Sequence, residues 1–370
     1  MPPPPKYVVT CGRKLYAPSG ISRWKRRTSS NWPAILGAAG KERADGSVIP
    51  QHAESNQNGD HDHDHDPYSA YDRYGTYDVL VIGGTGVDTI VRVDSLPVPL
   101  ADSVHVGPIE EWPGHTGGNV ALGARALGLK VGLLDCIGDD WIGAQVRERM
   151  AKGGVDFLPL ISPAGTRRAV NLVDASGRRM SFYDGRDPAD LRMPRDFYLP
   201  RLRRTRHVHL SIMNFGRFLY EDIEDLGVPV STDLHDWDGL ADHHREFALR
   251  SDLVFFSAAG VGDEAPALMR EILRAGRAHT VVATAGADGS YVLTRDGGPD
   301  PCHIPAAVPS APVVDSNGAG DAYVCGFLYG GLAGRDVREC ARLGAIAGAH
   351  ACTAPGSTAL ISRESLLSRA

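Results

Sequence analysis

From residue 77 onward, short apolar runs alternate with segments of helical periodicity, and this alternation restricts the chain to few folds. The first run, residues 77–82, ends at Gly83-Gly84, as a buried strand of a parallel sheet does. Further strands are predicted at residues 130–136, 207–212, 229–234, 252–256 and 280–283, and helices at 119–128, 140–152 and 322–332. Repeated β–α units predict an α/β protein with a mostly parallel central sheet and helices on both faces.

Two stretches, residues 90–111 and 166–183, interrupt this alternation. Both alternate apolar and polar residues without an intervening helix, which predicts antiparallel strands that project from the main sheet as a small β-rich lid. Such a lid cannot bury both faces by itself, so its open edges favour a homodimer formed through the lid. The alternative is a monomer whose lid folds down on its own sheet. The apolar positions of the lid are expected to divide between covering a pocket and contacting the partner: Val104, Val106, Val170, Leu172 and Phe182.

Residues 1–76 differ from the rest of the chain. Residues 1–43 carry nine Lys/Arg against the single acid Glu42, whereas residues 44–72 carry seven Asp/Glu and no Lys or Arg. Few periodic apolar positions occur in either block, so we predict a disordered, Pro-rich and charged extension ahead of a folded domain at 77–370. A basic targeting segment is the alternative for its start. The alternating His and Asp of residues 61–66 are interpreted as a solvated tail in preference to a metal site.

Composition excludes several classes of partner. A net charge of −6 gives no basic footprint for nucleic acid, and no run approaches the ~18 apolar residues of a membrane span. The six cysteines form no CxxC pair, which argues against a structural zinc site. Their scatter favours reduced thiols and a cytoplasmic location.

The strongest chemical signal is the sequence Asp-Ser-Asn-Gly-Ala-Gly-Asp at residues 315–321, directly before a predicted apolar helix. Small residues at a helix N-terminus leave successive N–H groups pointing at one spot, which suits a phosphoryl group. Asp321 beside those amides can accept a proton from a substrate hydroxyl. The alternative from these residues alone is a glycine-rich helix cap closed by an ordinary N-terminal Asp.

Together with other motifs, this segment resembles the PfkB/ribokinase family of ATP-dependent sugar and nucleoside kinases. The N-terminal signature of the family is similar to residues 114–121, which lead into Leu127-Gly128. Residues 131–133 and 137–143 match the stretch that follows, and residues 315–321 match the C-terminal signature. The resemblance covers residues 77–366 and implies a ribokinase-like three-layer α/β/α sandwich.

The resemblance also implies a role for individual residues. Asp321 would be the catalytic base, and the amides of Gly318, Ala319 and Gly320 would form the anion hole. Asp88, Gly118 and Asn119 would bind the substrate; a turn residue is the alternative for Asp88 and a helix N-cap for Asn119. Thr284, Gly286 and Gly289 would lie on the nucleotide side, where a bare turn is the alternative.

Three departures from the family pattern bear on the chemistry. Residues 257–260, Ser-Ala-Ala-Gly, replace the usual Asn-x-x-Glu that organises Mg²⁺, with Asp263 and Glu264 slightly downstream. Gly86 stands where ribokinases carry an asparagine that contacts ribose. Carbonyl oxygens around Asp315, Asn317 and Gly356 are candidates for a K⁺ site, but Leu360 lacks the hydroxyl expected there.

The sequence therefore predicts transfer of the ATP γ-phosphoryl group to a hydroxymethyl group of a sugar-like substrate, with Mg²⁺ and with K⁺ as a further candidate. A nucleoside kinase and a catalytically weak small-molecule-binding protein remain alternatives. In the lid, two arginines facing the pocket would indicate a carboxylate or phosphate on the substrate. Arg167 and Arg168 are the candidates, whereas Arg178 and Arg179, at a predicted hairpin turn, are expected to face solvent.

Overall fold

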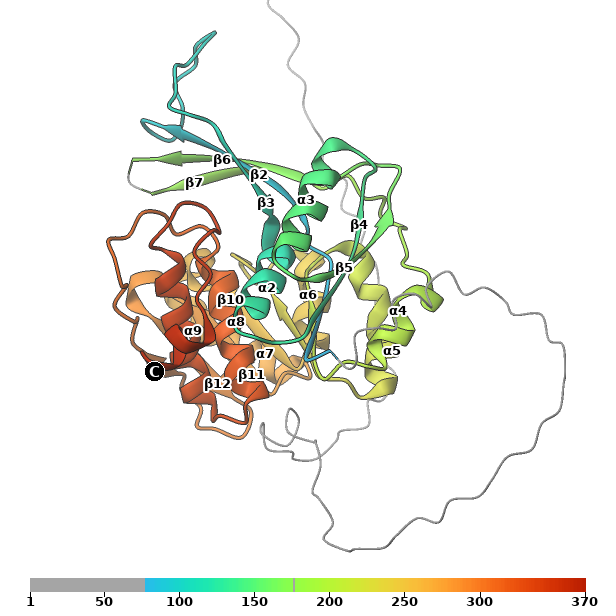
Figure 1. The fold of residues 1–370 in the computed structure, drawn as a ribbon. Helices are drawn as coiled ribbons and strands as arrows, with labels where there is room; N and C mark the ends of the chain where they lie inside the picture. The colour runs from blue at the N-terminus through green and yellow to red at the C-terminus, as the bar shows by residue number, and fades with distance from the viewer. Residues whose placement is uncertain (1–76, 176) are drawn as a thin grey trace, which may run out of the picture. The chain divides into compact units, whose positions relative to one another are not determined.

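The computed structural model describes residues 77–175 and 177–370 of the chain (Figure 1). The predicted disorder of residues 1–76, the targeting alternative and the interpretation of the His–Asp repeat all concern residues outside this range. They remain predictions.

A nine-stranded sheet forms the centre of the described chain, in the order β13-β12-β11-β10-β9-β8-β1-β4-β5. The strands from β11 to β5 run parallel, and β12 and β13 add an antiparallel edge. Their bounds are β1 (Val79–Ile82), β4 (Val131–Ile137), β5 (Asp156–Ile161), β8 (Val208–Leu210), β9 (Val230–Asp233), β10 (Leu253–Ser257), β11 (Thr280–Thr284), β12 (Ser290–Thr294) and β13 (Cys302–Ile304). The predicted mostly parallel sheet is confirmed.

Helices cover both faces of this sheet (Figure 1). They are α2 (His115–Ala126), α3 (Trp141–Lys152), α4 (Arg195–Leu202), α5 (Tyr220–Leu226), α6 (Asp242–Arg250), α7 (Ala265–Ala275), α8 (Ala319–Leu332), α9 (Val337–Ala351) and α10 (Arg363–Leu367), with short 3-10 turns η2 (Asn214–Leu219), η3 (Ala258–Gly260), η4 (Gly262–Glu264) and η5 (Gly286–Asp288). Alternate residues of β1 enter two separate cores: Val79 and Val81 pack with α2, α3, α8 and α9, and Leu80 and Ile82 with α4 to α7. The fold is the predicted three-layer α/β/α sandwich.

A separate four-stranded sheet, in the order β3-β2-β6-β7, forms the lid. Its strands are β2 (Gly86–Val93), β3 (Glu110–Gly114), β6 (Arg168–Asp174) and β7 (Arg179–Asp184). β2 pairs antiparallel with β3, and β6 with β7, but β2 and β6 pair in parallel. The expectation of purely antiparallel strands was therefore wrong. Because β2 follows β1 and β6 follows β5, both strands leave the same edge of the main sheet in the same direction.

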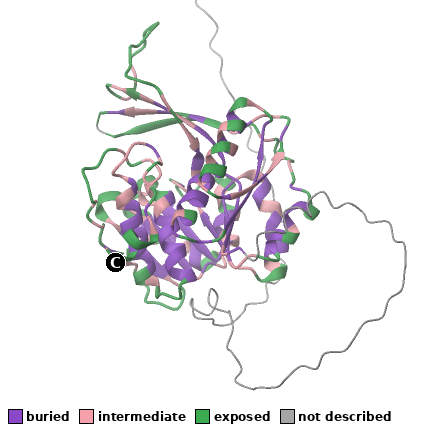
Figure 2. Ribbon diagram, viewed as in Figure 1, coloured by how far each residue is buried: buried purple, intermediate pink, exposed green. Residues whose placement is uncertain are grey.

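The two faces of the lid differ in chemistry. Along β7, side chains alternate, so Arg179, Ser181 and Tyr183 share one face and Met180 and Phe182 share the other. We call the first the inner face, because Tyr183 donates a hydrogen bond to Met213 of the main domain. The second, outer face also carries Val170 and Leu172. All of β7 is exposed, whereas the central strands of the main sheet are buried (Figure 2).

Within the described residues, no helix combines the length and apolar character needed to cross a lipid bilayer. The five described cysteines form no disulfide with one another: Cys136, Cys302, Cys325, Cys340 and Cys352.

Candidate active site

The 315–320 loop contains Gly318, at a position that only glycine suits. Gly318 is the N-cap of α8 with φ +75°, and an added Cβ would lie 2.9 Å from that of Ser357. The helix begins at Ala319, three residues earlier than predicted, because Ala319 and Gly320 form its first turn. No backbone carbonyl of the described chain accepts from the amides of Gly318 or Gly320. The Ala319 amide donates to the Ser316 carbonyl at 3.2 Å, so the amides of Gly318 and Gly320 are among those left open at the helix N-terminus.

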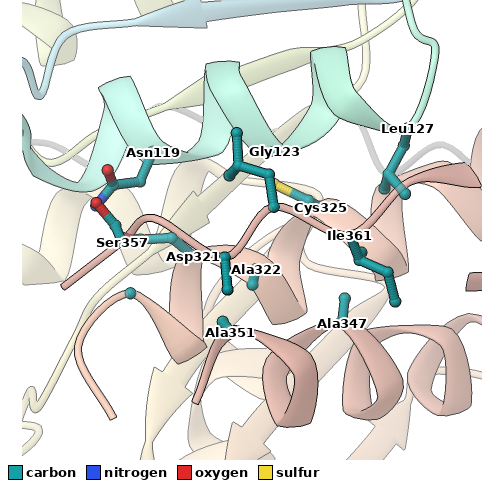
Figure 3. Close-up of a pocket in the computed structure, with 13 residues that line it drawn as sticks. Asn119, Gly123, Leu127, Asp321, Ala322, Cys325, Ala347, Ala351, Ser357 and Ile361 are labelled. Carbon is teal, nitrogen blue, oxygen red and sulfur yellow. The ribbon is translucent and has the colours of Figure 1, made fainter. Parts of the chain in front are cut away.

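Asp321 is buried in the first turn of α8 and is held by a residue of another helix. Asn119 Nδ2 donates to Asp321 Oδ2 at 2.8 Å, and the two side chains face one another across α2 and α8 (Figure 3). The N-cap of α2 is Gly114, so Asn119 lies inside the helix and does not cap it. The structure therefore brings together two predicted site residues that are 202 positions apart.

Burial raises the pKa of the Asp321 carboxyl to about 8, and the nearby carboxylates Asp233 and Asp88 add to the rise. The hydrogen bond from Asn119 and the charge of Arg179 act in the opposite direction. A carboxylate that is buried and repelled by two others binds a proton readily, which is the property of a general base. A cation placed among these groups would favour the ionised form of Asp321.

Asp88 lies in lid strand β2 and not in a turn, which corrects the alternative considered from the sequence. Its Oδ1 accepts a hydrogen bond of 3.0 Å from Asn171 Nδ2, and Asn171 Oδ1 accepts one of 2.6 Å from Ser181. These three side chains form a polar chain on the inner face of the lid, with groups that donate and accept hydrogen bonds. This chemistry suits the hydroxyl groups of a sugar.

His115 completes this polar group and was missed from the sequence. Its Nε2 lies 3.5 Å from Asp88 Oδ1, its ring centroid lies 6.0 Å from that of Tyr183, and no hydrogen-bond partner satisfies the buried Nε2 in the described chain. The residue has φ +55°, which non-glycine residues adopt rarely and mostly where a site requires it. The available signal was a histidine inside a glycine-rich motif.

The His115 ring also explains the glycine at position 86. A Cβ at Gly86 would lie 3.1 Å from the His115 ring and 2.6 Å from the Arg167 carbonyl oxygen. No side chain of the asparagine type fits there. Gly118, by contrast, is buried beneath the site, where its amide donates to Gly84 and its α-carbon faces Met150.

The predicted nucleotide-side residues lie between β11 and β12. Thr284 ends β11, where its hydroxyl donates to the Phe256 carbonyl at 3.4 Å, and Gly286 begins η5 with open space at its Cβ position. Gly289 has φ +93° and packs against the Ile304 carbonyl, where a Cβ would come within 2.2 Å. Gly289 is thus required by close backbone packing, whereas Gly286 is on an accessible turn.

The carboxylates suited to a divalent cation lie elsewhere than the family motif predicts. Ser257 caps η3 with its own hydroxyl, and Asp263 and Glu264 are exposed in η4. Asp233, at the carboxyl end of β9, lies closer, with Oδ2 4.0 Å from the Cβ position of Gly320. The described residues form no group of three or more His, Cys, Asp or Glu side chains arranged to hold a metal. Asp233 has the oxygen chemistry to hold a Mg²⁺ whose remaining ligands would be phosphate oxygens and water.

Asp315 ties together the residues named for a monovalent cation. Its Oδ1 accepts from the Asn317 amide at 2.9 Å and its Oδ2 from the Gly356 amide at 3.0 Å. Arg92 of the lid lies 3.9 Å from the same carboxylate. The structure therefore brings Asp315, Asn317 and Gly356 together.

Arg167 does not face the pocket. It is fully buried, forms ion pairs with Asp135 at 2.5 Å and with Asp187, and donates to the Thr85 carbonyl at 3.2 Å. Asp135 in turn accepts from the Thr85 amide at 2.7 Å. This cluster joins β4 of the main sheet to the three chain segments that enter or leave the lid at residues 85, 167 and 187.

The other lid arginines divide between the faces. Arg168 is exposed and lies 3.8 Å from Asp184, whereas Arg178 is held by Asp174 at 2.6 Å. Arg179 lies on the inner face with Nη1 3.5 Å from Asn317 Oδ1. Arg179 is exposed, as predicted, but strand alternation also turns it toward the 315–320 loop.

A small cavity of about 20 Å³ lies behind Asp321, between α2, α8 and α9 (Figure 3). Its lining is mainly apolar and includes Gly123, Leu127, Cys325 and Ala347. This volume suits one water molecule and no sugar.

The model of the pfkB carbohydrate kinase family matches residues 77–208 and 250–363 of the chain. The protein belongs to this family. An acarbose 7(IV)-phosphotransferase of Actinoplanes sp. is 49% identical over 292 residues, which are 78% of this chain and 97% of that protein. A microbiome-derived acarbose kinase of known structure has a TM-score of 0.73 and 44% identity, covering 80% of this chain and 99% of its own.

More distant matches agree on the fold. A nucleoside kinase of Methanothermobacter thermautotrophicus is 29% identical over 294 residues, 72% of this chain and 86% of that protein. The ribokinase of Arabidopsis thaliana, solved with ribose and ATP, has a TM-score of 0.68 at 20% identity, covering 79% of this chain and 98% of its own. The chain is thus an enzyme of the carbohydrate kinase class, and the non-catalytic binding protein is set aside.

Proposed function

We propose that this enzyme transfers the γ-phosphoryl group of ATP to a hydroxymethyl group of a sugar-like substrate, with a multi-ring sugar such as acarbose as the first candidate. One observation carries the proposal: Asp321, held by Asn119, lies beside two open amides and opposite the polar group around Asp88. The similarity to two acarbose kinases, at 49% and 44% identity, supports the choice of substrate.

The reaction requires one bond to form and one to break. The substrate hydroxyl oxygen bonds to the γ-phosphorus while the bond from that phosphorus to the oxygen bridging it to the β-phosphate breaks, and ADP leaves with the electron pair. Asp321 accepts the hydroxyl proton, and the amides of Gly318 and Gly320 stabilise charge on the phosphoryl oxygens. Kinases of this family generally use ATP and Mg²⁺; the metal would neutralise phosphate charge, with Asp233 as the carboxylate that organises it.

The substrate side favours a neutral polyhydroxylated molecule. Arg167 is neutralised by Asp135 and Asp187, and Arg168 is on the outer face, so neither offers a cation beside Asp88. Asn171 and His115 instead provide hydrogen-bonding groups. The half-exposed ring of Tyr183 beside them offers a surface on which a further sugar ring can pack.

Two further features belong to the proposal. Asp315, Asn317 and Gly356 would bind K⁺ through backbone carbonyls, so activity in K⁺ should exceed that in Li⁺ at equal ionic strength. A homodimer would form through the outer face of the lid, where Val170, Met180 and Phe182 are 37%, 47% and 53% exposed. An apolar face and an open strand edge at β7 both favour association.

The proposal is tested by assaying the purified protein with ATP against acarbose, maltose, monosaccharides and nucleosides, with phosphorylated products identified by mass spectrometry. We expect a phosphorylated multi-ring sugar. Phosphorylation of nucleosides alone would favour the nucleoside kinase instead, for which the 29% identical relative is the argument. Asp321→Asn should lower kcat by ~10²–10⁴ while ATP binding persists. The exposed Asp300→Asn serves as the matched control.

A further inference from the structure

The register of the lid aligns its inner face into rows. Asp88, Ala169 and Tyr183 stand opposite one another on β2, β6 and β7. Two rows further out along the strands, Arg92, Val173 and Arg179 do the same. The first row faces the site of substrate hydroxyls, and the last carries two guanidinium groups toward the 315–320 loop.

The two guanidinium groups of the last row differ in their partners. Arg92 lies 3.9 Å from Asp315 and 3.7 Å from Glu110, so two carboxylates balance its charge. Arg179 approaches the neutral amide oxygen of Asn317 at 3.5 Å, and no acidic side chain of the described residues lies within 4.0 Å of it. Asn317 directly precedes the glycine whose amide opens the N-terminus of α8. Arg179 thus forms no direct ion pair with a carboxylate of the described residues, and its charge acts on the nearby Asp321 carboxyl.

A second observation is the departure from the family pattern at residues 257–260. Residues 257–260 contain no carboxylate where the family places the Asn-x-x-Glu that organises Mg²⁺. Charge on the transferring phosphoryl group must then be neutralised in part by another cation. An arginine is suited to this task, because its planar fork binds two phosphoryl oxygens at once.

We propose that Arg179 is a catalytic residue that the lid delivers to the γ-phosphoryl group during transfer, in partial replacement of the missing Asn-x-x-Glu. The proposal rests on the proposed kinase function. In it, the guanidinium binds the phosphoryl oxygens while the bond to the acceptor hydroxyl forms and the bond to ADP breaks. Because β7 also carries Ser181, whose hydroxyl reaches Asn171 beside Asp88, one strand would couple substrate binding to the placement of Arg179.

The test compares Arg179→Met and Arg179→Lys with the control Arg168→Met, an arginine of the same lid on its outer face. We expect Arg179→Met to lower kcat by ~10²–10³ with KM for ATP changed less than ~3-fold, as for loss of one transition-state contact. Arg179→Lys should recover only part of this, since a lysine cannot form the fork, and Arg168→Met should behave as the unmodified enzyme.

A binding measurement separates a contact of Arg179 with the transferring phosphoryl group from a general structural effect of the substitution. With Mg²⁺, ADP affinity should be unchanged in Arg179→Met, whereas the affinity for ADP with aluminium fluoride, which mimics the phosphoryl group in transit, should fall by the factor seen in kcat. An unchanged affinity for ADP with aluminium fluoride would overturn the inference. A rise in KM for the sugar at constant kcat would also overturn it. If the unmodified enzyme phosphorylates no acceptor, the proposed function fails. The affinity for ADP with aluminium fluoride then still decides whether Arg179 contacts the phosphoryl group.

Discussion

In the main sheet, β1, β4 and most of β10 and β11 are buried on both faces, whereas in the lid sheet β7 is exposed along its whole length. The first sheet is stabilised by two apolar cores, and its polar residues at the carboxyl ends of strands, such as Asp233, take part in the candidate site. The lid has little core of its own. Its inner face instead carries the polar side chains that would contact the substrate. The comparison separates a region that provides stability from one to which the proposed function assigns recognition.

The buried Arg167 cluster is where these two regions meet, and its loss should have the largest effect on stability. Arg167→Met leaves Asp135 and Asp187 as buried carboxylates without a counter-ion, which should lower the free energy of unfolding by about 3–5 kcal/mol. Urea denaturation measures this change. The neighbouring exposed Arg168→Met should cost less than about 0.5 kcal/mol.

A second variant sharpens that test. Adding Asp187→Asn to Arg167→Met removes one of the uncompensated charges, so part of the lost stability should return. If Arg167→Met is as stable as the unmodified protein, the cluster does not hold the lid to the main sheet.

The second prediction concerns the main sheet alone, whose stability should depend on pH. His207 and His209 are buried, and both contact the Ser231 hydroxyl, at 2.8 and 2.9 Å. Burial lowers their pKa values to about 3 and about 4, from an ordinary value of 6.5. The unfolded chain therefore binds protons that the folded chain does not, and stability present above pH 6.5 is lost as the pH falls. At pH 5 each histidine should cost about 2 kcal/mol.

The measurement is Tm or urea stability between pH 7 and pH 4.5. His207→Gln removes one titrating group, so the fall in stability should be shallower than in the unmodified protein. The control is His303→Gln, an exposed histidine of β13 that should leave the slope unchanged. Equal slopes for all three proteins would contradict the burial of a neutral His207.

The difference in burial between strands also explains which of them could be predicted from the sequence. Strands buried on both faces, such as β1 and β4, appear as continuous apolar runs and were predicted close to their observed bounds. The strands at the edges of the sheet, β5, β12 and β13, were not predicted. Their burial is mixed, so their sequences show no clear apolar pattern. Alternation located the lid only in part, because residues 94–109 of the predicted stretch 90–111, with Val104 and Val106, form no strand. Alternation also does not specify partners, so the parallel pairing of β2 with β6 was missed.

The candidate site divides in the same way. The positions of Asp321, Asn119 and Asp88 followed from motifs, yet the bond between Asn119 and Asp321 joins residues 202 apart and required the fold. The roles of His115 and Arg167 depend on a ring filling the space above Gly86 and on ion pairs between distant segments. No local pattern in a single sequence encodes such contacts.

A third prediction concerns the outer face of the lid. Phe182→Glu places a charge in the proposed dimer contact and should weaken association by at least about 10-fold, since burying a Phe side chain contributes roughly 1.5–3 kcal/mol. Light scattering at micromolar concentration should change from a dimer to a monomer, with Tm nearly constant. Val308→Glu, which changes another exposed apolar residue but one outside the lid, should remain dimeric. A monomeric unmodified protein with full activity would remove the dimer proposal.

The smallest effect is expected for residues 1–76, which are outside the described residues. Deleting them should change Tm by less than about 1 °C and kcat by less than about 2-fold, because their sequence has no periodic apolar pattern to pack on a domain. The similarity to the Actinoplanes phosphotransferase supports this expectation, since 292 matched residues account for 97% of that protein. Parallel melting curves and acarbose assays on the full chain and on residues 77–370 make the comparison. A large fall in kcat with constant Tm would mean that the extension completes the site next to the lid. A fall in Tm would mean that the extension stabilises the main sheet. Either result would contradict the assignment of stability to the main sheet and of recognition to the lid.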